Sequence, residues 1–174
     1  MTIKDSILND NTAKYCGKID NDKILKYLNN ENIGYESGAG GAIHNYKSKL
    51  TITGSTINKN IALCCSGAIE DYCGDLIITK STINENIVKS NGGAVGTVRG
   101  KLIIIKSTIN MDKTMGLNST GGAIRSFKSE ITIKESEFTN NSAKKGGALY
   151  LTDSKHELNH CTFKNNTPDD IYDE

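Results

Sequence analysis

The ten residues TITGSTINKN, at positions 51–60, return along the chain with small changes. The later copies are IITKSTINEN at 77–86, IIIKSTINMD at 103–112 and TIKESEFTNN at 132–141. Before each copy stands a small residue or glycine, a second glycine, an alanine and an aliphatic residue. The second glycines of this motif are Gly41, Gly67, Gly93, Gly122 and Gly147, separated by 26, 26, 29 and 25 residues. A repeat period in this range is typical of a solenoid.

The spacing inside each repeat is fixed. From each of these glycines, fourteen residues lead to Ser55, Ser81, Ser107, Ser136 and Cys161, so the variation in length falls in the later turn. Segments such as LTIT, LIIT and ITIK are β-branched, and none keeps the apolar period of a helix. We therefore predict a parallel β-helix with about three strands per coil and a rise of about 4.8 Å per coil.

Stacked coils place equivalent residues in columns, and three of these columns are aliphatic. The first contains Ile3, Ile52, Ile78, Ile104, Ile133 and Leu158. The second contains Leu8, Ile57, Ile83, Ile109, Phe138 and Phe163. The third contains Leu50, Leu76, Leu102 and Ile131. We expect these columns to fill the core, where each buried side chain contributes roughly 1.5–3 kcal/mol.

Two polar columns support the same alignment. One contains Asn11, Asn60, Asn86, Asp112, Asn141 and Asn166, which we interpret as a structural ladder of stacked amides in turns. The other contains Lys49, Asp75, Lys101, Glu130 and Lys155, whose charge changes sign at every coil. Opposite charges on neighbouring strands support one another and like charges repel, so this alternation favours the proposed register.

The 174 residues form one predicted domain. Residues 1–39 are expected to be irregular N-terminal coils, 40–166 regular coils and 167–174 an acidic C-terminal tail. Within the first part, KILKYLNNEN at 23–32 fits either a degenerate coil or a short helix. We expect about six coils of about 26 residues in total.

Composition limits the functional classes. The formal net charge is +1, so nothing in the sequence as a whole favours nucleic acid or an anionic membrane as a partner. The longest apolar run is far shorter than a membrane helix, and the first ten residues lack the apolar core of a signal peptide. Five cysteines occur without any CxxC pair, so we expect no metal and no cofactor.

Two features of the repeat resemble a known family. They are the glycine motif and the residue three positions before each Asn of the Asn column. Residues 121–149 contain GGAI, then Phe138 with Asn141, then GGAL, and Phe163 with Asn166 repeats the second element. This pattern resembles the GGAI and FxxN repeat of chlamydial polymorphic outer membrane proteins, and also adhesin-like surface proteins of methanogens. Ser66 departs from it by replacing the first glycine of one copy. The resemblance covers residues 40–174 well and 1–39 loosely.

The resemblance implies a right-handed parallel β-helix similar to the pectin lyase superfamily, displayed outside the cell or on its surface. Because this chain has no signal peptide, we expect a fragment or a mature form. The function that the resemblance favours is a non-enzymatic, adhesin-like module that binds carbohydrate or protein. A pure spacer or stalk segment is an open alternative.

An enzyme that cleaves acidic polysaccharides is the second alternative that the resemblance suggests. Its site would use Glu70, Asp71, Arg99 and Arg125, which follow the glycine motifs on neighbouring coils. Glu70 and Asp71 are adjacent in sequence, however, and should point to opposite faces of a strand.

For binding, the column Tyr46, Tyr72, Val98 and Phe127, with His44 beside it, is the candidate contact stripe. The longest turn, Met111 to Thr120, is the candidate recognition loop. The expected partners are glycans or cell-surface proteins. We expect no nucleic-acid binding and no membrane insertion, and we expect end-to-end self-association through the solenoid ends.

Overall fold

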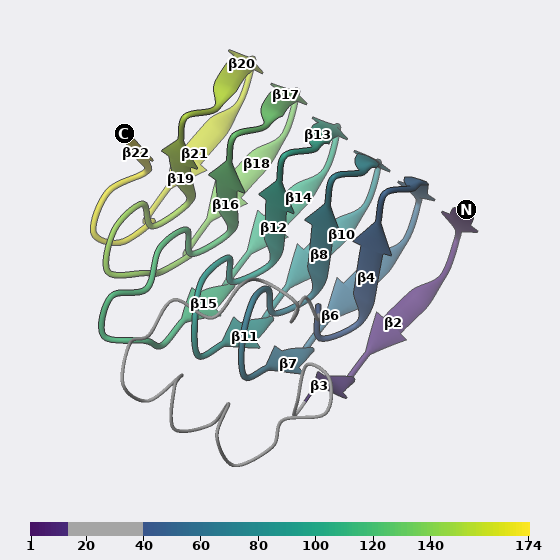
Figure 1. Ribbon diagram of the computed structural model, residues 1–174, viewed down its shortest axis with the longest axis horizontal. Helices are drawn as coiled ribbons and strands as arrows, with labels where there is room; N and C mark the ends of the chain where they lie inside the picture. The colour runs from purple at the N-terminus through teal and green to yellow at the C-terminus, as the bar shows by residue number, and fades with distance from the viewer. Residues whose placement is uncertain (14–39) are drawn as a thin grey trace.

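The computed structural model describes residues 1–13 and 40–174 of the chain. In these residues it contains 22 strands and no helix. All strand pairs are parallel, and the chain winds through them as a β-solenoid of about five turns (Figure 1). The predicted all-β, parallel solenoid is therefore confirmed.

Four sheets run along the solenoid, each built from one strand per coil. Sheet A contains β1 (Thr2–Lys4), β5 (Lys49–Thr53), β9 (Asp75–Thr79), β13 (Lys101–Ile105), β17 (Glu130–Lys134) and β20 (Lys155–Asn159). Sheet B contains β2 (Ile7–Asn9), β6 (Thr56–Asn58), β10 (Thr82–Asn84), β14 (Thr108–Asn110), β18 (Glu137–Thr139) and β21 (Thr162–Lys164). Sheet C contains β3 (Thr12–Ala13), β7 (Ile61–Ala62), β11 (Ile87–Val88) and β15 (Lys113–Thr114). Sheet D contains β4 (Ile43–Tyr46), β8 (Ile69–Tyr72), β12 (Val95–Val98), β16 (Ile124–Phe127), β19 (Leu149–Thr152) and β22 (Ile171–Asp173).

Two details of the prediction need correction. A coil contains up to four strands rather than about three, because the short strands of sheet C make a separate side. The described coils amount to about five turns rather than six. The irregular coil or helix expected within residues 14–39 lies outside the described residues.

The three aliphatic columns form the core in the predicted register. Ile52 pairs with Ile3 on one side and Ile78 on the other, and Ile83 pairs with Ile57 and Ile109. The members between the end coils are buried, and those of the first and last coils are partly buried. Because each coil stacks identical or similar side chains, the core continues along the whole solenoid axis.

The alternating charge column also has the predicted register. Lys101 pairs with Asp75 in the coil before and Glu130 in the coil after. The four ion pairs within 4 Å among the described residues involve other side chains, such as Lys106 with Glu135. The column therefore avoids stacked like charges without forming close ion pairs.

The Asn column is a hydrogen-bonded ladder inside the turn between sheets B and C. Nδ2 of Asn11 donates to Oδ1 of Asn60 at 2.9 Å, and Nδ2 of Asn60 donates to Oδ1 of Asn86 at 2.9 Å. The same Nδ2 of Asn60 donates to the carbonyl of Leu8 in the preceding coil at 3.1 Å. The left-handed backbone of these turns falls on the residue before the ladder Asn, such as Lys59 with φ 54°. The Asn therefore acts through its side chain.

Asp112 interrupts the ladder while fully buried. Its Oδ1 accepts from Nδ2 of Asn86 at 2.8 Å, as an amide oxygen would. Its Oδ2 has no hydrogen-bond partner and occupies the place that Nδ2 fills at the other coils. Burial raises the pKa of the Asp112 carboxyl well above its ordinary value, and the bonds from Asn86 only partly oppose this shift.

The second glycine of each motif sits where no side chain fits. A Cβ on Gly93 would lie 1.8 Å from the carbonyl oxygen of Gly122 in the next coil, and one on Gly67 would lie 2.0 Å from that of Gly93. This close backbone stacking explains the glycine column, Gly41, Gly67, Gly93, Gly122 and Gly147.

Candidate functional site

The outer face of sheet D carries most of the described aromatic side chains, while Phe138 and Phe163 lie in the core at sheet B. Alternate residues of the strands of sheet D point inward to the core, as Ile69 and Asp71 do in β8. The remaining positions form two outward columns. One contains His44, Glu70, Gly96, Arg125, Tyr150 and Tyr172. The other contains Tyr46, Tyr72, Val98, Phe127 and Thr152. All tyrosines in the described part of the chain therefore lie on this face.

Tyr46 and Tyr72 form a stacked pair on β4 and β8, at the N-terminal end of sheet D. Their ring centroids are 5.9 Å apart with 17° between the planes, and Tyr46 is 54% exposed. Nζ of Lys47 lies 5.0 Å from the centroid of the Tyr46 ring, and the His44 ring lies 6.3 Å away. Burial lowers the pKa of His44, so its imidazole is neutral at neutral pH. In the predicted stripe only Tyr46 is exposed, with a cation and an imidazole beside it; Tyr72 and Phe127 are half-buried and Val98 is buried.

A second aromatic pair lies at the other end of the same face. Tyr150 and Tyr172 stack with centroids 5.3 Å apart and planes 6° apart. Nζ of Lys145 lies 4.8 Å from the centroid of Tyr172, and the Tyr150 hydroxyl donates to the Glu174 carboxylate. The tyrosines of this pair are more covered than Tyr46, because Tyr150 is buried and Tyr172 is half-buried.

Glu70 points outward but is buried between coils. Oγ of Ser66 donates to its Oε2 at 2.5 Å, and the missing side chain of Gly96 leaves room for the carboxylate. Burial raises the pKa of Glu70, while the Ser66 hydroxyl and the charge of Arg125 oppose the shift. Ser66, the residue that departs from the glycine motif, therefore has a specific partner.

Asp71 points into the solenoid, on the opposite side of β8 from Glu70. Nδ2 of Asn45 donates to its Oδ1 at 2.6 Å, and Oγ1 of Thr97 donates to its Oδ2 at 3.4 Å. Burial raises the pKa of Asp71 to about 6, and both hydrogen bonds oppose the rise. Gly74 makes room for this carboxylate, since a Cβ there would lie 2.4 Å from Oδ1.

The four residues of the polysaccharide lyase or hydrolase alternative are therefore not gathered into one site. Asp71 is interior, Arg99 is exposed in the turn after β12 with φ 52°, and Arg125 is half-exposed on the outer face of sheet D. Only Glu70 and Arg125 share an outward column, with Gly96 between them. This arrangement offers no pair of facing carboxylates for acid–base chemistry.

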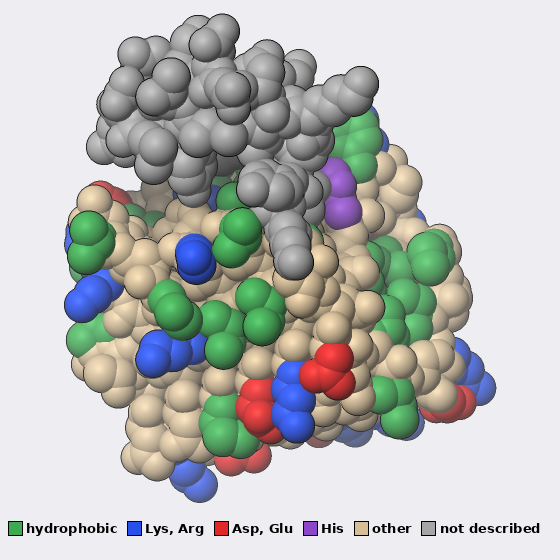
Figure 2. All heavy atoms as spheres, turned by 90° about the horizontal axis from the view of Figure 1, so that it is seen from below, with side chains coloured by type: hydrophobic (Ala, Val, Ile, Leu, Met, Phe, Trp, Pro, Cys, Tyr) green, Lys and Arg blue, Asp and Glu red, His purple; other side chains and the backbone are tan. Residues whose placement is uncertain are grey.

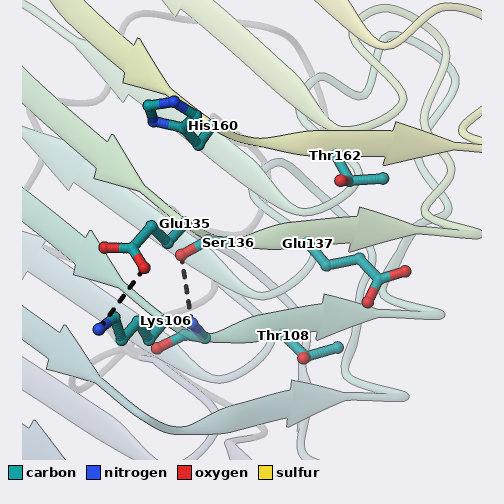
Figure 3. Close-up of a pocket in the computed structure, with 8 residues that line it drawn as sticks. Lys106, Thr108, Glu135, Ser136, Glu137, His160 and Thr162 are labelled. Atoms are coloured by element: carbon teal, nitrogen blue, oxygen red, sulfur yellow. Dashed lines mark hydrogen bonds and ion pairs between the residues drawn. The ribbon is translucent and has the colours of Figure 1, made fainter.

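A shallow depression of about 440 Å³ lies at the corner between sheets A and B (Figure 3). Thr108, Glu137 and Thr162 come from the neighbouring strands β14, β18 and β21, as Figure 3 shows. Nζ of Lys106 forms an ion pair with the Glu135 carboxylate of the next coil at 3.5 Å. The depression is open to solvent and lined by hydroxyls and charged groups, so it suits a polar edge of a ligand rather than an enclosed molecule.

The part of the chain that the structure describes contains no group of three or more His, Cys, Asp or Glu placed to hold a metal ion. Within the same residues, no helix is long and apolar enough to cross a membrane.

The solenoid and its glycine and Asn columns define a repeat protein of the parallel β class. Residues 135–152 match the family of the Chlamydia polymorphic membrane protein repeat. This segment contains Phe138, Asn141 and the glycine pair Gly146–Gly147, so the resemblance seen in the sequence is confirmed over these residues. No curated protein and no solved structure matches the chain.

Proposed function

We propose that the protein is a non-catalytic, adhesin-like binding module that presents the aromatic face of sheet D to glycans outside the cell. The observation that carries the proposal is the exposed Tyr46 ring, stacked on Tyr72 with His44 and Lys47 beside it. The C–H face of a sugar ring packs against an aromatic ring, while hydroxyls, imidazole and ammonium groups bond to its oxygens.

The scaffold supports this role. A solenoid with a continuous core holds its outward side chains on fixed strands, so the aromatic pair is ordered before a ligand arrives. Repetition along the axis also gives a polymer several equivalent positions to contact. The polar corner of Figure 3 would add hydroxyl and charged contacts on another side.

Two observations support an extracellular or cell-surface location. The matching repeat is described for membrane proteins of Chlamydia. The sulfur of Cys64 is part of a disulfide, and disulfides persist chiefly in oxidising compartments.

The test is retention of the protein on immobilised neutral and acidic polysaccharides. Tyr46→Ala should weaken retention about two- to tenfold, because it removes an aromatic contact of roughly 0.5–1.5 kcal/mol. Ile7→Ala is the control, since Ile7 is 74% exposed on β2 of sheet B, outside the aromatic face of sheet D. It should leave retention unchanged.

Equal retention of Tyr46→Ala and the unmodified protein would contradict the proposed site. Failure of the unmodified protein to bind any polysaccharide would contradict the glycan-binding function and favour a spacer segment.

A further inference from the structure

The longest turn of the solenoid carries an exposed apolar tip. The spacing of 29 residues between Gly93 and Gly122 places the extra residues between β15 and β16. Leu117 at the tip is 90% exposed, and Met115 before it is 55% exposed. Exposed large apolar residues on a soluble surface often mark a contact site.

Hydrogen bonds hold this turn to the coils on both sides. Thr120 donates through its backbone N and its hydroxyl to Oδ1 of Asn91 in the preceding coil, at 2.9 and 3.0 Å. The carbonyl of Ser119 accepts from the backbone N of Lys144 in the following coil at 3.1 Å. The turn is therefore fixed at its base.

The backbone of the turn also packs closely on the preceding coil. A Cβ on Gly116 would lie 2.4 Å from the carbonyl oxygen of Lys89, so only glycine fits there. Because the turn is held from both sides, the exposure of Leu117 belongs to the fold and does not result from a loose loop.

The turn adjoins the outer face of sheet C, since the backbone N of Met115 donates to the carbonyl of Val88 in β11 at 2.9 Å. Ile61 and Ile87 occupy one outward column, and Met111 lies at the adjoining corner. With Lys59 and Lys113 these residues line a shallow hollow of about 370 Å³. Figure 2 shows hydrophobic side chains next to Lys or Arg side chains on this side of the molecule, with Asp or Glu side chains also present.

Exposed lysines lie on the coils that contact this turn. Lys89, Lys113 and Lys144 are exposed and lie on three successive coils next to it. No described carboxylate forms an ion pair with any of them. Glu85 and Asp10 also line the hollow, and Glu85 lies at the position equivalent to Met111 in the preceding coil. The surface around the tip therefore combines apolar side chains with unpaired positive charge.

We propose that this surface docks on an anionic lipid bilayer. We name it the Met–Lys patch; its members are Ile61, Ile87, Met111, Met115, Leu117, Lys89, Lys113 and Lys144. Contrary to the expectation from the sequence that no part of the protein inserts into a membrane, Leu117 and Met115 enter the boundary between headgroups and acyl chains, and the lysines contact lipid phosphates and carboxylates. A projecting apolar tip with exposed lysines on the neighbouring coils fits a deformable, anionic surface, whereas a protein partner would need a pocket matched to the tip.

The test is co-sedimentation with two kinds of vesicle, one of phosphatidylcholine alone and one of phosphatidylcholine and phosphatidylserine in equal parts. The protein should bind only the anionic vesicles, and added salt should release it. Leu117→Ser should lower the partition coefficient about tenfold, because the burial of one Leu side chain is lost. Replacing both Lys89 and Lys113 with Ser should lower it by at least as much.

Ile7→Ser is the matched control, since Ile7 is 74% exposed on β2 of sheet B, outside the Met–Lys patch. This variant should bind like the unmodified protein. Equal binding to both kinds of vesicle, no binding to either, or binding unaffected by Leu117→Ser would overturn the proposal. The inference does not depend on the glycan site, and Leu117→Ser should leave retention on polysaccharides unchanged.

Discussion

Replacing Asp112 with Asn should stabilise the solenoid at neutral pH. By the register of the ladder, an amide at 112 would direct Nδ2 toward the carbonyl of Ile83 and Oδ1 of Asn141. The native Oδ2 at this place has no partner. Relief of one orphaned buried oxygen gives roughly 1–3 kcal/mol. We expect a gain of about 1–3 kcal/mol in the free energy of unfolding at pH 7.

The gain should depend on pH. Burial raises the pKa of Asp112 in the folded protein, so the unfolded chain loses this proton first as the pH rises above about 4. The contribution of Asp112 to the free energy of unfolding is therefore fully present below that pH. It is lost as the pH rises toward the pKa of Asp112 in the folded protein. Asn does not titrate, so the difference between variant and native protein should widen from pH 4 to pH 7.

The assay is urea unfolding at both pH values, followed by circular dichroism because the chain has no Trp. Asn60→Asp is the mirror control, since it places a carboxyl at another fully buried ladder position. It should destabilise the protein at pH 7. If Asp112→Asn gives no gain at pH 7, or the same gain at both pH values, the reasoning about the ladder is refuted.

Phe138→Ala should lower the free energy of unfolding by roughly 3–5 kcal/mol, because Phe138 is fully buried and stacks on Phe163; a loss below about 1 kcal/mol in urea titration would contradict its place in the core. Asp71→Asn should remove a pH dependence in the same assay, because native stability from Asp71 is present below about pH 4 and is lost as the pH rises to about 6. An identical pH profile for the variant and the native protein between these values would show that Asp71 is not buried as described.

The repeat made most of the fold predictable from sequence. Identical spacing in successive coils fixes which residues stack, so the aliphatic columns and the Asn ladder follow from alignment of the chain with itself. The short sheet C strands were not predicted, because two residues such as Ile61–Ala62 show no periodic pattern.

The candidate site was less predictable. Successive side chains of a strand point to opposite faces, so the sequence predicted that Glu70 and Asp71 face opposite sides. It did not predict that Asp71 is the interior residue. A signal was present: Gly74 and Gly100 stand where other coils have Ser129 or Ser154, which leaves room for a larger interior side chain. For the Met–Lys patch, the sequence predicted only a long recognition loop. It did not predict the exposure of Leu117, because that exposure depends on contacts with neighbouring coils. End-to-end self-association stays a prediction.

The most direct test of the proposed function is a single assay of the unmodified protein on a panel of acidic and neutral polysaccharides, with and without calcium. Both retention and newly formed reducing or unsaturated ends are measured. A non-catalytic glycan-binding module should be retained on at least one polysaccharide without producing new ends. New ends would contradict the account and make the protein an enzyme.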